Sequence, residues 1–326
     1  MSSLPKRAGI FPALFLCLPT NASAEPRLAM PVDCELGKTC FIQNYMDRDP
    51  SPKARDFTCS GLSYDTHKGT DFALPSLAAM HEGVDIRAAA TGVVKGARDG
   101  MIDKPYTIAE KARIEGRDCG NGLVLRHDNG WETQYCHMKK GSIRVKSGQV
   151  VQAGEVLGQV GLSGRTQFPH LHLSVRKDGT PIDPFTPDDL ADTCNSGPTR
   201  TMWIDDIPYQ PGGLIAAGFS ANVPSYDEIK SGKAANAILP ADAPAIVLWG
   251  YAFGGKQADV MELEIDGPKG RVYQSRLLIK KDQAQFFRAG GKRLKQPLQN
   301  GNYTGIVRLI RKGKTISRKT ITARVE

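Results

Sequence analysis

The sequence lacks several features that would point to other classes of protein. Outside its first residues it has no run of about 18 apolar residues, so no membrane-spanning helix is expected. It has no C-x-x-C pair, which weakens the case for a zinc site built from thiolates. It also has no aromatic-basic motif of the kind that binds nucleic acid. We therefore expect neither a stable membrane anchor nor a nucleic-acid partner.

The first 24 residues have the pattern of a secretory signal peptide. Lys6 and Arg7 are followed by an apolar stretch, residues 8–18, that is too short to span a bilayer. The small residues Ala22-Ser23-Ala24 then form a typical cleavage site, so Glu25 is expected to begin the mature chain. This pattern predicts export across the inner membrane, with the periplasm as the destination.

Cysteine usage agrees with export. Cys17 leaves with the signal, and the bulky Leu16 before it argues against lipid attachment. An even number of cysteines remains, which in an exported protein predicts up to three disulfides. The remaining cysteines are Cys34, Cys40, Cys59, Cys119, Cys136 and Cys194. Many pairings are possible; we favour Cys119–Cys136, because a hairpin between the two would bring their strands together. A zinc-thiolate site is the alternative.

The chain is basic. Loss of Lys6 and Arg7 with the signal takes two positive charges and lowers the formal net charge from +9 to +7. A basic exported protein suits an anionic partner, such as a cell-wall polymer or a membrane surface. The alternative is an ordinary solvated charged surface.

The pattern of turns and apolar runs predicts an all-β protein with several parts. Residues 25–60 are rich in Pro, Asp and Cys and read as a loop-rich segment held by disulfides. Residues 61–190 read as a small, mostly antiparallel β domain, with residues 97–118 as a polar surface excursion. Strands are predicted over residues 83–94, 122–126, 131–137, 150–160 and 171–176. The Asp128-Asn129-Gly130 sequence between two of these runs predicts a hairpin.

Beyond a polar linker, residues 200–326 predict a β-sandwich, which could be immunoglobulin-like. Seven short strands separated by turn residues are expected there: 214–219, 245–251, 260–265, 271–279, 284–288, 303–311 and 314–325. Its last strands are strongly basic. Wall binding and a simple solvated basic face are both open interpretations of this feature, and no catalytic motif occurs in this part.

The chain has only six histidines, and their placement indicates metal chemistry. His170 and His172 lie two residues apart in a predicted strand, so they project from the same face. Paired imidazoles on one face are unusual as packing residues. Imidazole and carboxylate groups are zinc ligands, and a catalytic zinc site uses three protein ligands and leaves a position open for water.

At this point the sequence resembles the lysostaphin-type (LytM-type) zinc metalloendopeptidases, which cut peptidoglycan peptides. The resemblance covers about residues 60–185, and its motifs occur in the order and spacing of that family. The matching segments are His67-Lys-Gly-Thr-Asp71, Ala90-Thr-Gly-Val-Val94, Gly120-Asn-Gly-Leu-Val124, His127-Asp-Asn-Gly-Trp-Glu-Thr-Gln-Tyr-Cys-His137, Gly154-Glu-Val-Leu-Gly-Gln-Val-Gly-Leu-Ser-Gly164, Pro169-His-Leu-His-Leu-Ser-Val175 and Asp183-Pro184.

The resemblance implies that Zn²⁺ is held by His67, Asp71 and His172. The sequence from His81 to Asp85 has the same H-x-x-x-D spacing, but the family's aspartate lies well ahead of the Gly-Val strand, which favours the earlier pair. The remaining histidines of the site, His137 and His170, are then expected to be catalytic and to face the metal without binding it. His81 is expected in a surface loop and His127 beside the hairpin turn.

The function implied by the resemblance is an exported zinc endopeptidase that hydrolyses peptide bonds in peptidoglycan cross-links through a zinc-activated water. One alternative is a non-enzymatic wall-binding or amidase-activating module, since some members of the family have lost their ligands. Another is a zinc protease that acts on protein substrates. The Ser163-to-Pro169 loop departs from the family pattern, as does the longer loop before Gly83. We expect these departures to change the shape of the substrate groove more than metal binding.

Overall fold

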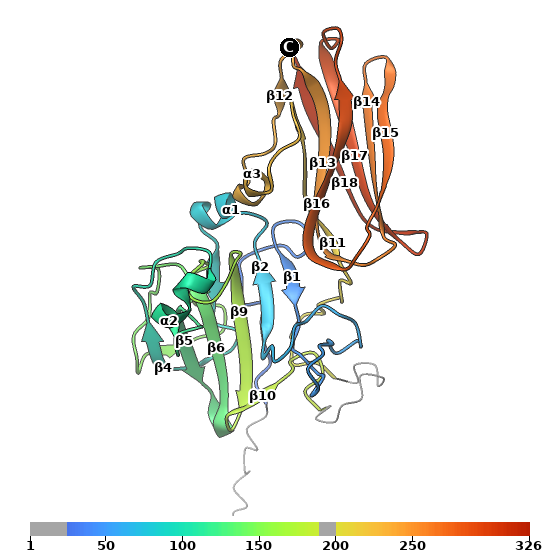
Figure 1. The fold of residues 1–326 in the computed structure, drawn as a ribbon. Helices are drawn as coiled ribbons and strands as arrows, with labels where there is room; N and C mark the ends of the chain where they lie inside the picture. Colours follow the sequence, from blue (N-terminus) through green and yellow to red (C-terminus); the bar gives the residue numbers. More distant parts are fainter. Residues whose placement is uncertain (1–24, 189–199) are drawn as a thin grey trace, which may run out of the picture.

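A computed structural model describes residues 25–188 and 200–326 (Figure 1). The predicted signal peptide and Cys194 lie outside the described residues. Strands dominate the described chain, as expected for an all-β protein, and they form two groups of sheets that share a contact region. In the described ranges, no helix is long and apolar enough to cross a membrane.

The first group is built on an eight-stranded antiparallel sheet in the order β1-β2-β9-β6-β5-β4-β7, with β10 paired to β9. Its strands are β1 (Phe41–Asn44), β2 (Thr70–Ala73), β4 (Gly92–Arg98), β5 (Asn121–Arg126), β6 (Trp131–Met138), β7 (Val150–Val151), β9 (His170–Lys177) and β10 (Thr180–Ile182). A small second sheet pairs β3 (Asp85–Arg87) with β8 (Val156–Gln159). The helical elements are short: α1 (Leu77–Glu82), η1 (Ile108–Glu110), α2 (Lys111–Ile114) and η2 (Asp128–Gly130).

The predicted hairpin is confirmed. Strands β5 and β6 are paired antiparallel on either side of residues 128–130. Asn129 and Gly130 both have positive φ angles, 52° and 76°. Asparagine and glycine tolerate this left-handed conformation better than other residues, which is why this dipeptide closes tight hairpins.

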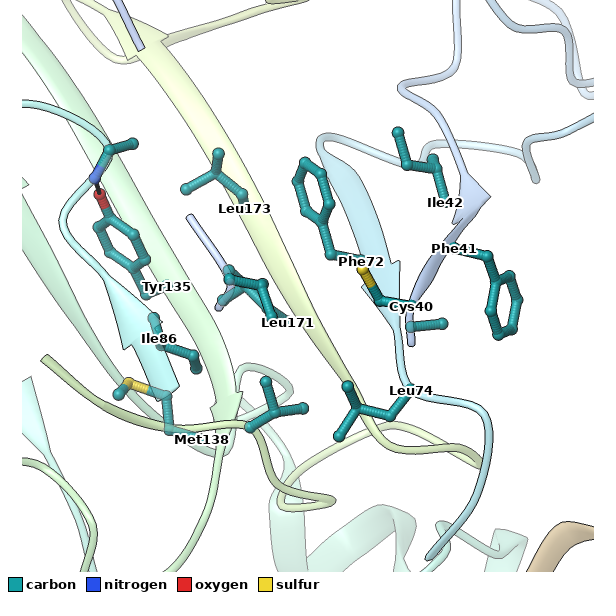
Figure 2. Close-up of a cluster of buried hydrophobic side chains, with 14 of the residues drawn as sticks. Cys40, Phe41, Ile42, Phe72, Leu74, Ile86, Tyr135, Met138, Leu171 and Leu173 are labelled. Atoms are coloured by element: carbon teal, nitrogen blue, oxygen red, sulfur yellow. Dashed lines mark hydrogen bonds between the residues drawn. The ribbon is translucent and has the colours of Figure 1, made fainter. Parts of the chain in front are cut away.

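Along β9, apolar side chains that point into the core alternate with the histidines singled out in the sequence. Leu171, Leu173 and Val175 are buried in the main hydrophobic cluster. Figure 2 shows Leu171 and Leu173 on the same side as Phe72 of β2 and Tyr135 of β6. Successive side chains of a strand point to opposite faces, so the histidines of β9 project from the other face of the sheet.

Residues 25–60 contain a strand that the sequence pattern did not reveal. Strand β1 pairs antiparallel with β2 and forms one edge of the large sheet. A Cys34–Cys40 disulfide closes the loop that leads into it. The favoured Cys119–Cys136 pairing is confirmed, and Cys59 is also disulfide-bonded.

The second group of sheets lies beyond residue 212. A three-stranded sheet has the order β11-β13-β16, and a five-stranded sheet has the order β12-β18-β17-β14-β15. The two share one apolar cluster, as the layers of a sandwich do. Their strands are β11 (Gly213–Ser220), β12 (Ile238–Leu239), β13 (Ala245–Gly255), β14 (Val260–Gly267), β15 (Gly270–Leu278), β16 (Gln283–Arg293), β17 (Gly301–Arg311) and β18 (Lys314–Val325), with α3 (Tyr226–Ser231) between β11 and β12.

The three-stranded sheet contacts the first group of sheets through apolar side chains. Trp249, Tyr251 and Phe253 of β13 belong to the same buried cluster as the core of the large sheet. Phe253 packs on Phe41 of β1, with 4.6 Å between ring centroids. The two parts therefore share a continuous hydrophobic contact, and β1 lies at it.

Candidate metal centre

Three side chains from two distant segments of the sequence meet at one point. His67 lies just before β2, Asp71 lies on β2, and His172 lies on β9 directly opposite Asp71 in the strand register. The Asp71 Oδ1 atom is 3.1 Å from His67 Nε2 and 2.8 Å from His172 Nδ1, and these two nitrogens are 3.1 Å apart. Among the described residues, this trio forms the cluster with metal-binding geometry.

The hydrogen bond made by the outer nitrogen of each imidazole determines which nitrogen faces that point. His67 Nδ1 is 2.7 Å from the carbonyl oxygen of Tyr45, so it carries a proton and donates to that acceptor. His172 Nε2 lies 3.0 Å from the Ser174 hydroxyl and can donate in the same way. The inward nitrogens of the two neutral rings then carry lone pairs.

This arrangement fits a zinc ion. Two imidazole nitrogens and an ionised carboxylate oxygen lie within 3.1 Å of one another, which is a donor set that a cation can occupy. Bonds of about 2.0–2.1 Å in a tetrahedral site place neighbouring ligand atoms about 3.3 Å apart. The observed separations of 2.8–3.1 Å are close to that value. Three protein ligands also leave one tetrahedral position open, as in catalytic zinc sites.

Asp71 is buried, with only 2% of its surface exposed. Burial alone would raise its pKa, but the neighbouring imidazoles of His67 and His170 and the hydrogen bonds from His170 and His172 hold the pKa well below its usual range. Its second oxygen, Oδ2, accepts a 2.9 Å hydrogen bond from Asn44 Nδ2. Asp71 is therefore ionised and directs a single oxygen, Oδ1, at the three histidines.

His137 and His170 lie beside this trio. Their ring centroids are 4.6 Å apart, and the centroid of His137 is 6.1 Å from that of His172. His137 Nδ1 donates to the carbonyl oxygen of Ser163 at 2.8 Å, and His170 Nδ1 lies 3.0 Å from the carbonyl oxygen of Phe168. In both rings, Nε2 is therefore the nitrogen that can accept or donate a proton in a reaction. His170 Nε2 is 3.4 Å from Asp71 Oδ1.

The electrostatics keep two of these imidazoles neutral. Burial lowers the pKa of His172, and burial together with the nearby His170 and His172 lowers the pKa of His137 well below 6.5. For His67, burial lowers the pKa, but the adjacent Asp71 carboxylate outweighs this effect and raises it overall. Protons therefore compete most strongly with a metal ion at His67.

A groove of about 720 Å³ opens over the centre. His67, His137 and His172 are among the residues that line it, and His170 is not. The Cys119–Cys136 disulfide forms part of its wall. The remaining lining residues are Tyr64, Asp65, Thr66, Lys68, Asp118, Gln134, Arg165 and Ser174.

The second H-x-x-x-D sequence lies away from the cluster. His81 is exposed on α1, and Asp85 on β3 accepts a hydrogen bond from Gln159. His127 bonds the carbonyl of Thr91 and the hydroxyl of Thr133, which supports a structural role at the start of the hairpin turn. The structure thus brings together the five residues chosen from sequence and places His81 and Asp85 away from them.

Sequence reasoning did not identify the groups that orient the site. Asn44, the Tyr45 carbonyl, the Ser163 carbonyl and the Ser174 hydroxyl each hold a site side chain from behind. Asn44 is 27 residues before Asp71, in a segment without periodicity, and carbonyl groups have no sequence signature. Of the four, Ser174 had a local signal, because it follows His172 by two residues on the same face of β9.

Comparison with known proteins agrees with this geometry. Residues 65–184 match peptidase family M23, and this range contains all five site residues. We refer to this matched range as the M23 domain. The similarity to lysostaphin-type enzymes expected from the sequence motifs is confirmed.

Curated relatives of the M23 domain include enzymes that act on cell walls. The chain is 35% identical over 122 residues to the DD-carboxypeptidase/endopeptidase Mpg of Neisseria meningitidis, a match that covers 37% of this chain and 22% of that protein. It is 34% identical over 117 residues to the peptidoglycan DD-endopeptidase ShyA of Vibrio cholerae, covering 36% of this chain and 22% of that one. The match thus spans about a fifth of these relatives' length.

Solved structures of M23 proteins also align with the chain. The catalytic domain of EnpA from Enterococcus faecalis, as its A109H mutant, aligns at 25% identity over 47% of this chain and 95% of that chain, with a TM-score of 0.33. This score is too low to support a structural argument. The assignment of the M23 domain rests on the sequence match.

Proposed function

We propose that the protein is an exported zinc endopeptidase that hydrolyses peptide bonds in peptidoglycan cross-links. The observation that carries the proposal is the convergence of three ligand atoms, from His67, Asp71 and His172, beside a groove that the two histidines line. Relatives of the M23 domain that are named as peptidoglycan endopeptidases support the choice of substrate. Their substrate lies outside the cytoplasm, which agrees with the predicted signal peptide and a periplasmic location.

His67 Nε2, Asp71 Oδ1 and His172 Nδ1 are the proposed zinc ligands. When bound, zinc supplies a water molecule whose pKa is lowered to about 7, and a Lewis acid for the substrate carbonyl. The chain's own contribution is to direct these ligand atoms. The hydrogen bonds to Tyr45 and Ser174 orient the two rings, and burial lowers the pKa of His172.

His137 and His170 are the proposed proton-transfer groups. His137 lines the groove, its Nδ1 is held by Ser163, and its lowered pKa leaves Nε2 as a free base at neutral pH. It can therefore accept a proton from the attacking water and return it to the leaving amine, as general base and then general acid. His170 does not line the groove; it presents Nε2 to Asp71 Oδ1 at 3.4 Å and assists from there.

The charges that line the groove suit a peptide with both acidic and basic groups. Lys68 and Arg165 supply positive charge, and Asp65 and Asp118 supply negative charge. Stem peptides of cell walls carry free carboxylates and amines close to their cross-links. Charge complementarity of this kind selects and orients a ligand more than it adds affinity.

The decisive experiment uses the mature protein and its His172→Ala variant. Bound zinc is counted first, and purified sacculi are then digested and the released fragments identified by mass spectrometry. We expect about one zinc per chain, and muropeptides whose cross-links are opened by the parent protein and not by the variant.

The alternatives give different results in the same experiment. Bound zinc without muropeptide release indicates a binding or activating module. Cleavage of test polypeptides with intact sacculi indicates a protease of protein substrates. Either outcome overturns the proposed substrate.

A further inference from the structure

Strand β1 contacts the metal centre from outside the M23 domain. Asn44 lies opposite Asp71 in the β1–β2 register, and its Nδ2 donates to Asp71 Oδ2 at 2.9 Å. That bond occupies the carboxylate oxygen that does not face the histidines. It fixes the rotation of the carboxyl group, so that Oδ1 is the atom presented to a metal.

The residues after Asn44 hold the second ligand. The Tyr45 carbonyl accepts from His67 Nδ1 at 2.7 Å, and the Asp47 backbone N–H donates to the His67 carbonyl at 2.8 Å. The first bond selects the ring tautomer that leaves Nε2 free, and the second fixes the backbone that carries the ring. Partners of this kind raise metal affinity by orienting ligands before the ion arrives.

Strand β1 is also attached to the C-terminal sheet. Phe41 packs on Phe253, and Gln43 Nε2 donates to the carbonyl of Ala284 at 3.2 Å. Gln285 Nε2 in turn donates to Gln43 Oε1 at 2.9 Å. A register shift lies between Ile42 and Asn44, and within four residues the strand contacts the C-terminal sheet through Phe41 and Gln43 and a proposed metal ligand through Asn44.

We infer that β1 is a positioning strand for the metal centre and that the C-terminal sheet holds it in place. This inference rests on the proposed zinc site. It gives the C-terminal sandwich a role in metal affinity, although no catalytic group comes from it. It also implies that residues 65–184, the M23 domain, depend on groups that lie outside that range at both ends of the chain.

The first test is the zinc affinity of full-length mature variants, measured by competition with a chromogenic chelator. Asn44→Ala removes the donor, and Asn44→Leu removes it while keeping the same number of side-chain heavy atoms and the branch at Cγ. We expect both to weaken zinc binding by about 10- to 100-fold, the usual effect of losing an outer partner of a metal ligand. Asn302→Ala, which changes an exposed asparagine of β17, is the matched control and should bind zinc like the parent.

Melting of the zinc-free proteins separates positioning from folding. A positioning role predicts that the melting temperature of the zinc-free Asn44 variants stays close to that of the parent. The extra stability gained on adding zinc should shrink, because that gain follows affinity. Zinc affinity within twofold of the parent in both Asn44 variants, or a loss of affinity matched by a loss of zinc-free stability, overturns the inference.

The second test addresses the C-terminal attachment. Gln285→Ala removes the hydrogen bond to Gln43 from the C-terminal side, distant in sequence from the metal ligands. We expect about a twofold or greater loss of zinc affinity, within the range seen for residues that act through a neighbour. An unchanged affinity refutes the role of the C-terminal sheet.

All these readouts use zinc alone and no substrate. If the parent protein binds zinc and leaves sacculi intact, the proposed peptidoglycan activity fails while the positioning role is still measured. If the parent binds zinc and opens cross-links but the Asn44 variants bind zinc normally, the positioning role alone fails. A parent protein that binds no zinc refutes both.

Discussion

Removal of the Cys119–Cys136 disulfide is expected to affect both stability and turnover. The bridge joins residues 17 apart in sequence. The loop-closure relation for a loop of that length gives about 3 kcal/mol of stabilisation, through restriction of the unfolded chain. The Cys34–Cys40 bridge, with a separation of 6, gives about 2 kcal/mol by the same relation.

The two bridges differ more in their relation to the site. Cys136 immediately precedes His137, and the backbone N–H of His137 donates to the Cys119 carbonyl at 2.8 Å. His137 also has a positive φ of 62°, a conformation that a residue with a side chain adopts only when its surroundings impose it. The disulfide supplies part of that restraint, so its loss should misplace the His137 imidazole, the proposed proton-transfer group.

The assay compares the parent with the Cys119→Ser/Cys136→Ser double variant. Guanidinium unfolding of the zinc-free proteins, followed by tryptophan fluorescence, measures the stability loss, and muropeptide release measures turnover with zinc content checked in parallel. We expect about 3 kcal/mol less stability and at least a tenfold lower turnover at unchanged zinc content. The matched Cys34→Ser/Cys40→Ser variant should lose stability without the tenfold loss of turnover. A double variant at Cys119 and Cys136 that keeps full turnover would refute the reasoning about His137.

The remaining predictions concern the histidines. His172→Ala should abolish stoichiometric zinc binding and activity, because it removes one of the three proposed ligands. His81→Ala, measured alongside by metal analysis, should leave the zinc content unchanged. The reverse pattern would reject the assignment of the ligands. His137→Ala should keep its zinc and lower turnover by about 10²- to 10⁴-fold, the range for losing a general acid–base group; loss of the metal in this variant would instead make His137 a ligand. Zinc affinity should fall as the pH is lowered. The pKa of His67 is raised above 6.5, so protons begin to compete with zinc for His67 already above that pH. The pKa of His172 is lowered, so protons begin to compete with zinc for His172 only below that pH. Chelator competition between pH 8 and pH 5 measures this dependence, and a flat profile would contradict it.

Most of the strands were predictable from sequence, because their signals are local. The Asp128-Asn129-Gly130 turn, the alternation in β9 and the regular turns beyond residue 212 all reflect short-range backbone preferences. Strand β1 was not predictable in this way. Only four residues long, it is held by β2 on one side and by Phe253 and Gln285 on the other, and none of these contacts is encoded in its own pattern.

The sequence by itself determined the types of group in the candidate metal centre. These are four imidazoles and one carboxylate, and they occur in motifs specific enough to indicate their roles. The tertiary structure decided how those groups are presented. The β2–β9 register places Asp71 opposite His172, and backbone carbonyls of Tyr45 and Ser163 select which nitrogen of His67 and His137 is free. The type of a residue determines which of its atoms can form bonds. The proton and lone pair on each atom depend on a partner that folding brings from elsewhere in the chain.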